Sequence, residues 1–269
     1  AWSINAGPLA QIRTMTHHIA ACQFEPTIGA IDDNYRTIRE RATTLNDKVS
    51  LAVFPELCLT GYNLEVAVDA ATSVPGPHTD RLADIATAAD CTLVVGLPER
   101  DGDAIYNDLV CVSSDGVEAV YRKQYPWGDE GDAFATGDGP VTTETPVGTV
   151  GFLLCYDLNF PEAALAYARQ DVDILAVSAA WRESYRADWN LLLRARALDG
   201  PCYTIGSNHA GDQRDRTHAG GSLVAGPDGT VQDRTSDGAA TVSVPVDPDK
   251  LAAARDRNPV RETRTERTL

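Results

Sequence analysis

The chain has 269 residues, of which 43% are apolar, so it can bury a substantial core and is neither a disordered tail nor a small disulfide-held scaffold. Asp and Glu total 39 against 23 Lys and Arg, which gives a formal net charge of −16. This charge argues against nucleic acid and against an anionic membrane as partners.

The first half of the chain predicts strands that alternate with helices. Residues 1–14 precede the single methionine, Met15, and we treat them as an extension outside the fold, with residues 15–269 as one domain. Apolar runs predict strands at residues 19–24, 51–54 and 92–96. Apolar side chains at helical spacing predict helices at residues 32–45 and 79–89.

The second half adds hairpins to this pattern. Asp115-Gly116 separates residues 106–112 from 117–121 and predicts an antiparallel pair. Turns that contain Pro and Gly predict two further pairs, 141–145 with 150–154 and 222–225 with 230–231. Helices are expected at 162–170 and 186–198, and strands at 174–177 and 203–207. The pattern predicts one mixed α/β domain in which helices cover sheets.

The cysteine spacing and the lack of long apolar runs bear on the compartment. The six cysteines are far apart and form no Cys-x-x-Cys pair, so we expect free, buried thiols. No run approaches about eighteen apolar residues, and no charged-then-apolar signal pattern opens the chain. We therefore expect a cytoplasmic protein that does not span a membrane.

Lysine is scarce in this sequence. Only Lys48, Lys123 and Lys250 are present, and the other basic residues are arginines. A lysine-poor acidic surface is typical of proteins that work in concentrated salt, where screening suppresses the repulsion between carboxylates. We expect a halophilic protein, although an ordinary acidic cytosolic protein stays possible on composition alone.

The segment around Cys155 is the richest in chemistry. An apolar strand ends at Cys155, the chain turns, and Pro161 suits the first position of a helix. A cysteine at such an elbow faces backbone amides and a helix dipole, which favour the thiolate and stabilise an oxyanion. The alternative is a cysteine that only packs at the end of its strand.

Two other polar residues interrupt apolar segments. Glu56 directly follows the strand at residues 51–54, where an unpaired carboxylate is costly. Lys123 ends the second strand of the first hairpin in a chain that otherwise prefers arginine. A salt bridge for Glu56 and a solvated surface position for Lys123 are the structural alternatives.

Together these three segments resemble the nitrilase, or carbon–nitrogen hydrolase, superfamily, whose members carry a Glu-Lys-Cys set in this chain order. The matching motifs are Phe54-Pro-Glu-Leu, Tyr121-Arg-Lys and Cys155-Tyr-Asp-x-x-Phe-Pro-Glu. The flanking matches span residues 19–246 and comprise Gln23, Gly137-Asp138, Arg194-Ala-Arg-Ala-Leu198, Ser207-Asn208 and Gly220-Gly-Ser222.

The resemblance implies a four-layer α-β-β-α sandwich and a role for each matching residue. Glu56 is expected to be the general base and Cys155 the nucleophile. Lys123 and the backbone amide of Tyr156 are expected to stabilise the oxyanion. The family also places a second acid near the lysine, which matches Glu130; the alternative is that Glu130 is one of several solvated acids. No metal and no organic cofactor is implied.

The sequence departs from the family beside the lysine. Residues 124–127 read Gln-Tyr-Pro-Trp where His-Leu is common, so one wall of the pocket is unusual and the substrate preference stays open. Our candidates for substrate-binding side chains are Asn63, Tyr125, Trp127, Trp181 and His209. For each of them a purely structural role is an equal alternative.

The expected activity is hydrolysis of a non-peptide C–N bond. The first candidate is conversion of a small-molecule amide to a carboxylic acid and ammonia through a cysteine thioester. Alternatives are an N-carbamoyl amino acid or amine hydrolase, a nitrilase, and a non-catalytic binding protein. A nucleotide-binding protein is disfavoured because neither Gly-x-Gly-x-x-Gly nor a Walker-type loop follows the first strand.

The resemblance also implies a homo-oligomer, a dimer or larger. We expect the contact face to contain the helix that begins near Pro161. Its apolar residues surround more of the helix than burial on one side requires; they are Ala163, Ala164, Ala166 and Tyr167.

Overall fold

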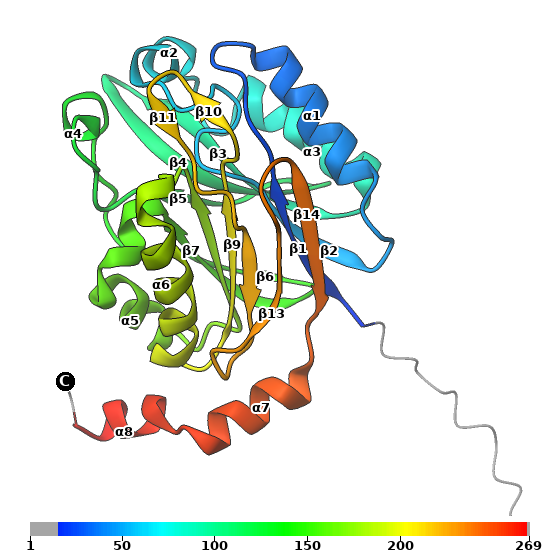
Figure 1. Ribbon diagram of the computed structural model, residues 1–269, viewed down its shortest axis with the longest axis vertical. Helices are drawn as coiled ribbons and strands as arrows, with labels where there is room; N and C mark the ends of the chain where they lie inside the picture. The colour runs from blue at the N-terminus through cyan, green and yellow to red at the C-terminus, as the bar shows by residue number, and fades with distance from the viewer. Residues whose placement is uncertain (1–15, 268–269) are drawn as a thin grey trace, which may run out of the picture.

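The computed structural model describes residues 16–267, and within them two six-stranded sheets pack face to face (Figure 1). The first sheet comprises β1 (His18–Gln23), β2 (Val49–Val53), β3 (Thr92–Asp101), β4 (Ala104–Ser113), β5 (Gly116–Arg122) and β14 (Ala240–Pro245). Its strand order is β14-β1-β2-β3-β4-β5. The pairs β1–β2 and β2–β3 are parallel, and the other three pairs are antiparallel.

The second sheet repeats this plan. It comprises β6 (Thr142–Thr145), β7 (Gly148–Leu154), β8 (Ile174–Ala179), β9 (Tyr203–Asn208), β12 (Leu223–Ala225) and β13 (Val231–Arg234). Its order is β13-β12-β9-β8-β7-β6, with β7, β8 and β9 parallel. A separate short hairpin joins β10 (Asp212–Gln213) to β11 (Arg216–Thr217).

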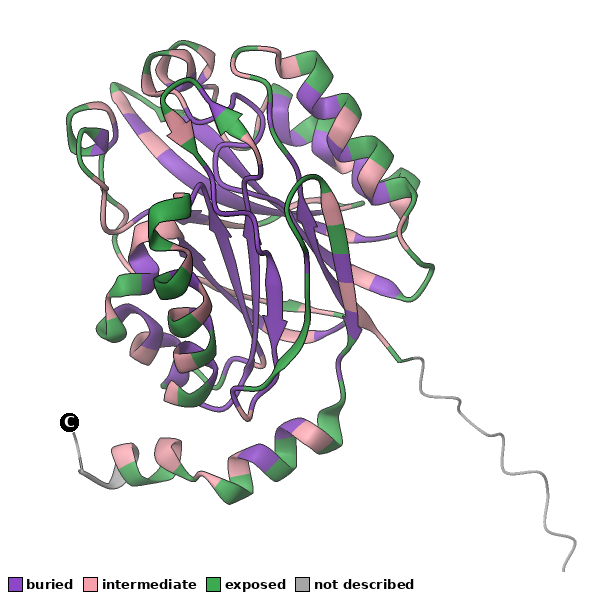
Figure 2. Cartoon of the chain, in the orientation of Figure 1, coloured by how far each residue is buried: buried purple, intermediate pink, exposed green. Residues whose placement is uncertain are grey.

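Helices cover the outer face of each sheet. The first sheet is covered by α1 (Ile31–Thr43) and α3 (Pro77–Ala89), and the second by α5 (Pro161–Ala168) and α6 (Arg186–Asp199). One apolar cluster lies between the sheets and one lies under each helix pair, so the central strands are buried on both faces while the helices expose one (Figure 2). The predicted four-layer α-β-β-α sandwich is confirmed.

The sequence pattern explains these elements. All six residues of β8 are buried, as expected for a parallel strand covered on both faces. In α1 the buried side chains Tyr35, Ile38 and Ala42 follow helical spacing, and the exposed Asp32 and Asp33 lie in the first turn, where the helix dipole favours them. The three predicted hairpins are observed as β4–β5, β6–β7 and β12–β13.

Several elements escaped the sequence prediction. They are the short helices α2 (Leu64–Ala70) and α4 (Glu130–Ala133), the β10–β11 hairpin, the edge strand β14, and α7 (Pro248–Arg257) and α8 (Val260–Arg267). Two 3-10 segments, Cys155–Asn159 and Glu183–Tyr185, were also not predicted. Most of these elements are too short to show a period, and long-range contacts hold them. The proposed extension, residues 1–14, lies outside the described residues.

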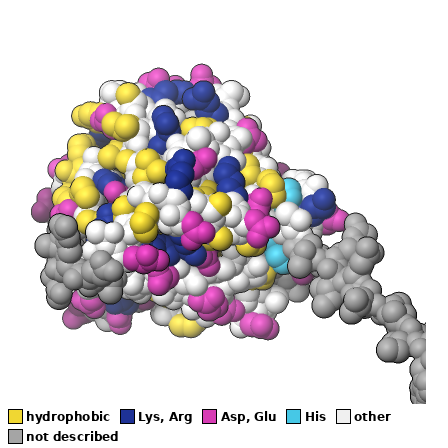
Figure 3. Space-filling model, turned by 90° about the horizontal axis from the view of Figure 1, so that it is seen from below, with side chains coloured by type: hydrophobic (Ala, Val, Ile, Leu, Met, Phe, Trp, Pro, Cys, Tyr) yellow, Lys and Arg dark blue, Asp and Glu magenta, His cyan; other side chains and the backbone are white. Residues whose placement is uncertain are grey.

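The C-terminal helices α7 and α8 pack against one end of the sandwich. Arg255 pairs with Asp173 at 2.8 Å and Arg261 pairs with Asp171 at 2.9 Å, while Leu251 joins the apolar cluster between the sheets. The view from below shows acidic, basic and apolar side chains interspersed over this end (Figure 3). No helix among the described residues is long and apolar enough to cross a bilayer.

Candidate active site

Polar residues gather where strands of both sheets end. Glu56 follows β2, Lys123 follows β5, Cys155 follows β7 and Ala180 follows β8. The hydroxyl of Ser178 in β8 donates to the carbonyl of Phe54 at 2.6 Å, which joins the ends of β8 and β2. Because parallel strands bring their carboxyl ends to one edge, residues far apart in sequence meet there.

Lys123 lies between two buried carboxylates. Its Nζ is 2.7 Å from Glu56 Oε1, and 2.7 and 3.0 Å from the two carboxylate oxygens of Glu130. Each of the three side chains is at most 2% exposed. Burial by itself lowers the pKa of Lys123, but the two negative charges outweigh it and hold the pKa well above its usual range. Lys123 is therefore an ammonium and a hydrogen-bond donor.

Glu56 is held at both oxygens. Asn107 Nδ2 donates to Oε1 at 2.8 Å, and the Ala180 amide donates to Oε2 at 3.0 Å. The backbone carbonyl of Glu56 accepts a 2.5 Å hydrogen bond from Nε2 of the fully buried His209. Burial lowers the pKa of His209 to about 4, so the ring is neutral near pH 7. These contacts fix the orientation of the carboxylate.

Glu130 is equally enclosed, on the short helix α4. The Tyr62 hydroxyl donates to Oε1, and the Trp127 amide donates to Oε2 at 2.7 Å. Glu130 is thus no solvated surface acid: it binds the lysine, the tyrosine and the loop that carries Trp127.

Cys155 begins a 3-10 helix directly after β7. Its φ of +46° lies in the left-handed region, which is costly for a side chain with a Cβ and is often retained at functional turns. The five other cysteines all lie in the described part and are buried, whereas Cys155 is half-buried.

The expectation that the elbow favours a thiolate is wrong for the resting enzyme. Burial raises the pKa of Cys155 well above its usual range, and the charges of Glu56 and Glu130 raise it further. Lys123 and the Ala180 amide act in the opposite direction but are outweighed. The resting side chain is a thiol, so a base must remove its proton before it can attack.

Asp157 ties the elbow to the neighbouring loop. Its carboxylate accepts from Leu154 N at 3.0 Å, from Tyr121 OH at 2.7 Å and from Tyr125 N at 2.8 Å. Burial raises the pKa of Asp157 to about 6, although Lys123 and these donors lower it. Asp157 therefore holds together the turn that carries the cysteine and the loop after the lysine.

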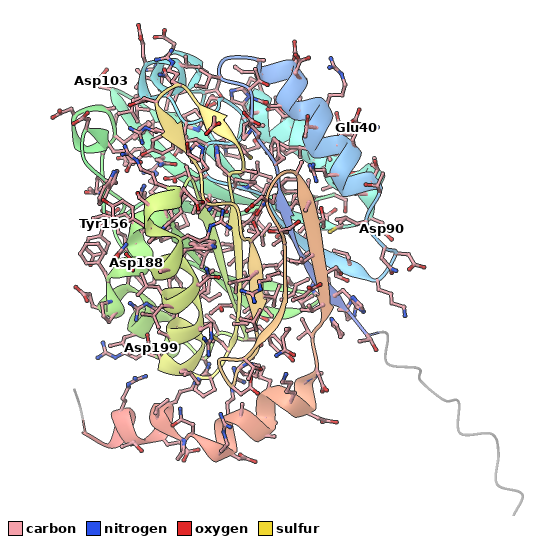
Figure 4. All side chains as sticks on the ribbon, in the orientation of Figure 1. Glu40, Asp90, Asp103, Tyr156, Asp188 and Asp199 are labelled. Atoms are coloured by element: carbon pink, nitrogen blue, oxygen red, sulfur yellow. The ribbon has the colours of Figure 1, made fainter. Side chains whose placement is uncertain are left out.

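A cavity of about 250 Å³ opens onto Cys155. Its lining residues are Tyr62, Trp127, Cys155, Tyr156, Asn159, Ala180, Trp181, Arg182, Tyr185, Asp188 and Arg216. Figure 4 labels two of them, Tyr156 and Asp188, on one flank of the molecule. The cavity is smaller than the roughly 300–1,000 Å³ of drug-sized sites, so it fits a small molecule.

Two of the five proposed substrate-binding residues line this cavity, Trp127 and Trp181. The ring of Tyr125 instead stacks on another ring, that of Phe160, with centroids 3.7 Å apart. Asn63 caps α2, where its side chain accepts from the Val66 amide. His209 lies behind Glu56. The structure therefore gives these three residues supporting positions, because motif neighbourhood does not show which way a side chain points.

Sequence reasoning missed several residues of the site, and Tyr62, Asn107, Arg182 and Arg216 are four of them. Tyr62 follows Glu56 by six residues in the same motif, so its spacing was a usable signal. Asn107 and Asp108 are adjacent polar residues in a largely apolar strand, which is a weaker signal. Arg182 and Arg216 showed no signal, because arginine is the ordinary basic residue of this chain.

Comparison with known proteins identifies the family that the sequence matches and several of its relatives. The family model described as carbon-nitrogen hydrolase matches residues 18–256. The human omega-amidase is 32% identical over 236 residues, which cover 83% of this chain and 84% of that protein. A nitrilase of Pyrococcus abyssi is 31% identical over 232 residues, covering 84% and 87% of the two chains.

Solved structures of similar fold come from the same group of proteins. Nit3 of Saccharomyces cerevisiae, a member of the nitrilase superfamily, superimposes with a TM-score of 0.85 at 24% identity, covering 91% of this chain and 95% of that one. The amidase of Nesterenkonia sp. AN1, with acrylamide added at its active-site cysteine, gives a TM-score of 0.76 at 25% identity, with 90% and 97% covered.

Proposed function

The chain belongs to the carbon-nitrogen hydrolase family of the nitrilase superfamily, and from this membership we propose that it hydrolyses a small amide to a carboxylic acid and ammonia through a thioester on Cys155. One observation carries the proposal. Cys155 lines one cavity together with Tyr62 and Ala180. Tyr62 and Ala180 donate hydrogen bonds to Glu130 and Glu56, the two buried carboxylates that flank the Lys123 ammonium. The relatives that are amidases by name support the choice of an amide over other C–N substrates.

The first step is attack by Cys155. Glu56 takes the thiol proton while Sγ forms a bond to the amide carbon, and the electron pair of the C=O bond moves to oxygen. The raised pKa of Cys155 is consistent with a proton transfer to Glu56 that is coupled to C–S bond formation, because the thiol then loses its proton only as the bond forms. Asn107 and Ala180 keep the carboxylate of Glu56 aimed during the transfer.

The oxyanion is stabilised by two donors. Lys123 is fixed as an ammonium by Glu56 and Glu130, and the Tyr156 amide follows the nucleophile directly. A preorganised donor of this kind contributes most where water is excluded, and Lys123 is only 2% exposed.

Collapse of the tetrahedral adduct breaks the C–N bond. The leaving nitrogen takes the proton that Glu56 accepted from the thiol, ammonia departs, and a thioester remains on Cys155. Water then attacks the thioester carbon, Glu56 accepts its proton, and breakage of the C–S bond returns the thiol. Glu130 is a positioning residue in this scheme, because it acts through Lys123.

The test is release of ammonia from a panel of amides, ureido acids and nitriles in high salt. We expect turnover of at least one small amide by the wild type and none by Cys155→Ala. Cys91→Ala is the matched control, because Cys91 is a buried thiol remote from the cavity, and it should retain activity. Turnover in Cys155→Ala would refute the mechanism, and release from ureido acids or nitriles alone would refute the amide assignment.

A further inference from the structure

Two arginines of the catalytic cavity lack anionic partners. Arg182 and Arg216 line the cavity, and neither forms an ion pair or donates a side-chain hydrogen bond to another residue that the structure describes. The nearby Arg186 shows the contrast, because it pairs with Glu183 at 2.6 Å and Asp237 at 2.9 Å. In a chain of net charge −16, unpaired guanidinium groups in a pocket are unexpected unless an anion binds there.

The backbone brings the two guanidinium groups together. Arg182 forms an antiparallel bridge with His218, and Arg216 precedes His218 by two residues. Opposite and diagonal residues of an antiparallel pair share a face, and diagonal Cβ atoms are about 7–8 Å apart. Arg182 and Arg216 therefore lie close enough to contact the two oxygens of one carboxylate with their long side chains.

Both arginines are held in place. The hairpin of Arg216 is anchored by Gln213, whose side-chain oxygen accepts from the Tyr62 amide at 3.0 Å. The Arg216 guanidinium lies 4.6 Å from the centre of the Tyr62 ring. The Nε of Arg182 is buried without an acceptor among the described residues, so part of this guanidinium is already stripped of water. A preorganised, partly desolvated donor binds an anion more strongly than a mobile surface arginine does.

The arginines are also close to the reacting centre. Arg182 is two residues after Ala180, whose amide binds the carboxylate of Glu56, and two residues of extended chain span about 7 Å. The cavity of about 250 Å³ leaves room for only a short chain between the two sites, and its tryptophans, Trp127 and Trp181, offer apolar walls for methylene groups.

We propose that the substrate is a short amide whose far end carries a carboxylate, and that Arg182 and Arg216 bind this carboxylate. The inference rests on the proposed function and adds the substrate class to it. Asp188 lines the same cavity and could hold an ammonium group, but its side chain is exposed, so water screens it more than the partly buried arginines. The pocket therefore favours an anion over a cation.

The experiment compares three probes at one fixed salt concentration: succinamate, butyramide and 4-aminobutyramide, which are anionic, neutral and cationic. We expect the highest kcat/KM for succinamate. Loss of one charge-assisted contact costs on the order of ten- to a hundredfold, so Arg182→Gln and Arg216→Gln should each lower the succinamate-to-butyramide ratio of kcat/KM by that factor. Arg182→Lys should restore part of the ratio, because it keeps the charge.

Arg214→Gln is the matched control, since Arg214 lies on the same hairpin but does not line the catalytic cavity. It should leave the ratio unchanged. A wild type that prefers butyramide or 4-aminobutyramide, or arginine variants that lower turnover of both amides equally, would overturn the proposal.

Binding separates this inference from the proposed function. Calorimetry of succinamate with Cys155→Ala should show affinity that falls on the order of ten- to a hundredfold when Arg182→Gln or Arg216→Gln is added. Arginine-dependent binding without ammonia release by the wild type would refute the amidase assignment alone. Ammonia release from amides without arginine-dependent binding would refute the carboxylate site alone.

Discussion

Lys123 is the residue at which size and charge are most tightly constrained. Its compact ammonium contacts Glu56 and Glu130 at 2.7 Å each, inside a site closed to water. Tyr62 on one side and Asn107 on the other extend the same hydrogen-bonded chain. An arginine can keep the charge, but its broad planar head cannot occupy the same position between two carboxylates.

We predict that Lys123→Arg lowers turnover by on the order of a hundred- to a thousandfold, as expected for loss of an oxyanion donor. The variant should fold, because the positive charge between the two acids is retained. The measurement is kcat with the best amide, together with a thermal melt. Lys48→Arg, at an exposed position, is the matched control and should behave as wild type. More than about a tenth of wild-type turnover in Lys123→Arg would contradict its assigned role.

At the scale of elements, the β3–β4–β5 part of the first sheet carries a buried acid pair outside the active site. Asp108 in β4 is fully buried, and no donor among the described residues reaches either of its carboxyl oxygens. Burial raises the pKa of Asp108 well above its usual range, and the neighbouring Glu99 of β3 raises it further. Asp108 therefore keeps its proton to a higher pH than a solvated aspartate does, while Arg122 of β5 pairs with Glu99 at 2.7 Å.

This proton makes stability depend on pH in a defined direction. An unfolded aspartate loses its proton near pH 3.9, whereas folded Asp108 retains it. The contribution of Asp108 to the free energy of unfolding is fully present below about pH 3.9. It falls by up to about 1.4 kcal/mol per pH unit as the pH rises toward the pKa of the folded protein. Asparagine cannot ionise, so this loss should disappear.

We predict that Asp108→Asn raises Tm at pH 7 and that its advantage over the wild type grows between pH 5 and pH 8. Thermal melts across this range are the measurement. Asp103→Asn, in the exposed turn between β3 and β4, is the control and should show no such trend (Figure 4). A constant difference between Asp108→Asn and wild type at every pH would show that Asp108 is ionised in the folded protein.

Helix α5, which was proposed for subunit contact, buries most of its apolar side chains within the chain instead of exposing them. Ala163, Ala164 and Tyr167 of α5 are buried within the chain, in the cluster under α5 and α6. The exposed large apolar side chains of this layer belong to α6 instead, Leu191 at 63% and Leu198 at 40% exposure. Oligomerisation stays a prediction, and α6 replaces α5 as its more apolar exposed face.

At the scale of the whole molecule, the net charge of −16 sets the response to salt. Exposed ion pairs such as Arg36–Asp33 contribute little to stability, so they do not offset the general repulsion between acidic side chains. We predict that Tm falls clearly between molar and millimolar salt, because weaker screening strengthens this repulsion.

The matched variant combines Glu40→Lys with Asp103→Lys, two exposed positions (Figure 4). Each change removes one negative charge and adds one positive charge, so the net charge moves from −16 to −12. The dependence of Tm on salt should become shallower in this variant. A Tm that does not change with salt in the wild type would contradict the halophilic interpretation. The cytoplasmic location stays a prediction.

The sequence by itself determined the mixed α/β class and, through the family resemblance of its motifs, the sandwich and the set of Glu56, Lys123 and Cys155. Buried parallel strands such as β8 appear as uninterrupted apolar runs, and Glu56 and Cys155 follow or end such runs. A local pattern reports local burial, so the central strands, three hairpins and the interrupting charges were visible along the chain.

Only the tertiary structure decided how the site is built. The thiol form of Cys155, the burial of Glu130 and the lack of an ion pair between Arg182 or Arg216 and any described residue each depend on neighbours distant in sequence. A charge buried at one position costs or gains free energy according to which other charges the fold brings near it. The sequence pattern does not show how far apart two such charges lie in the fold. The chemistry of the pocket therefore depends on how the two sheets pack against each other.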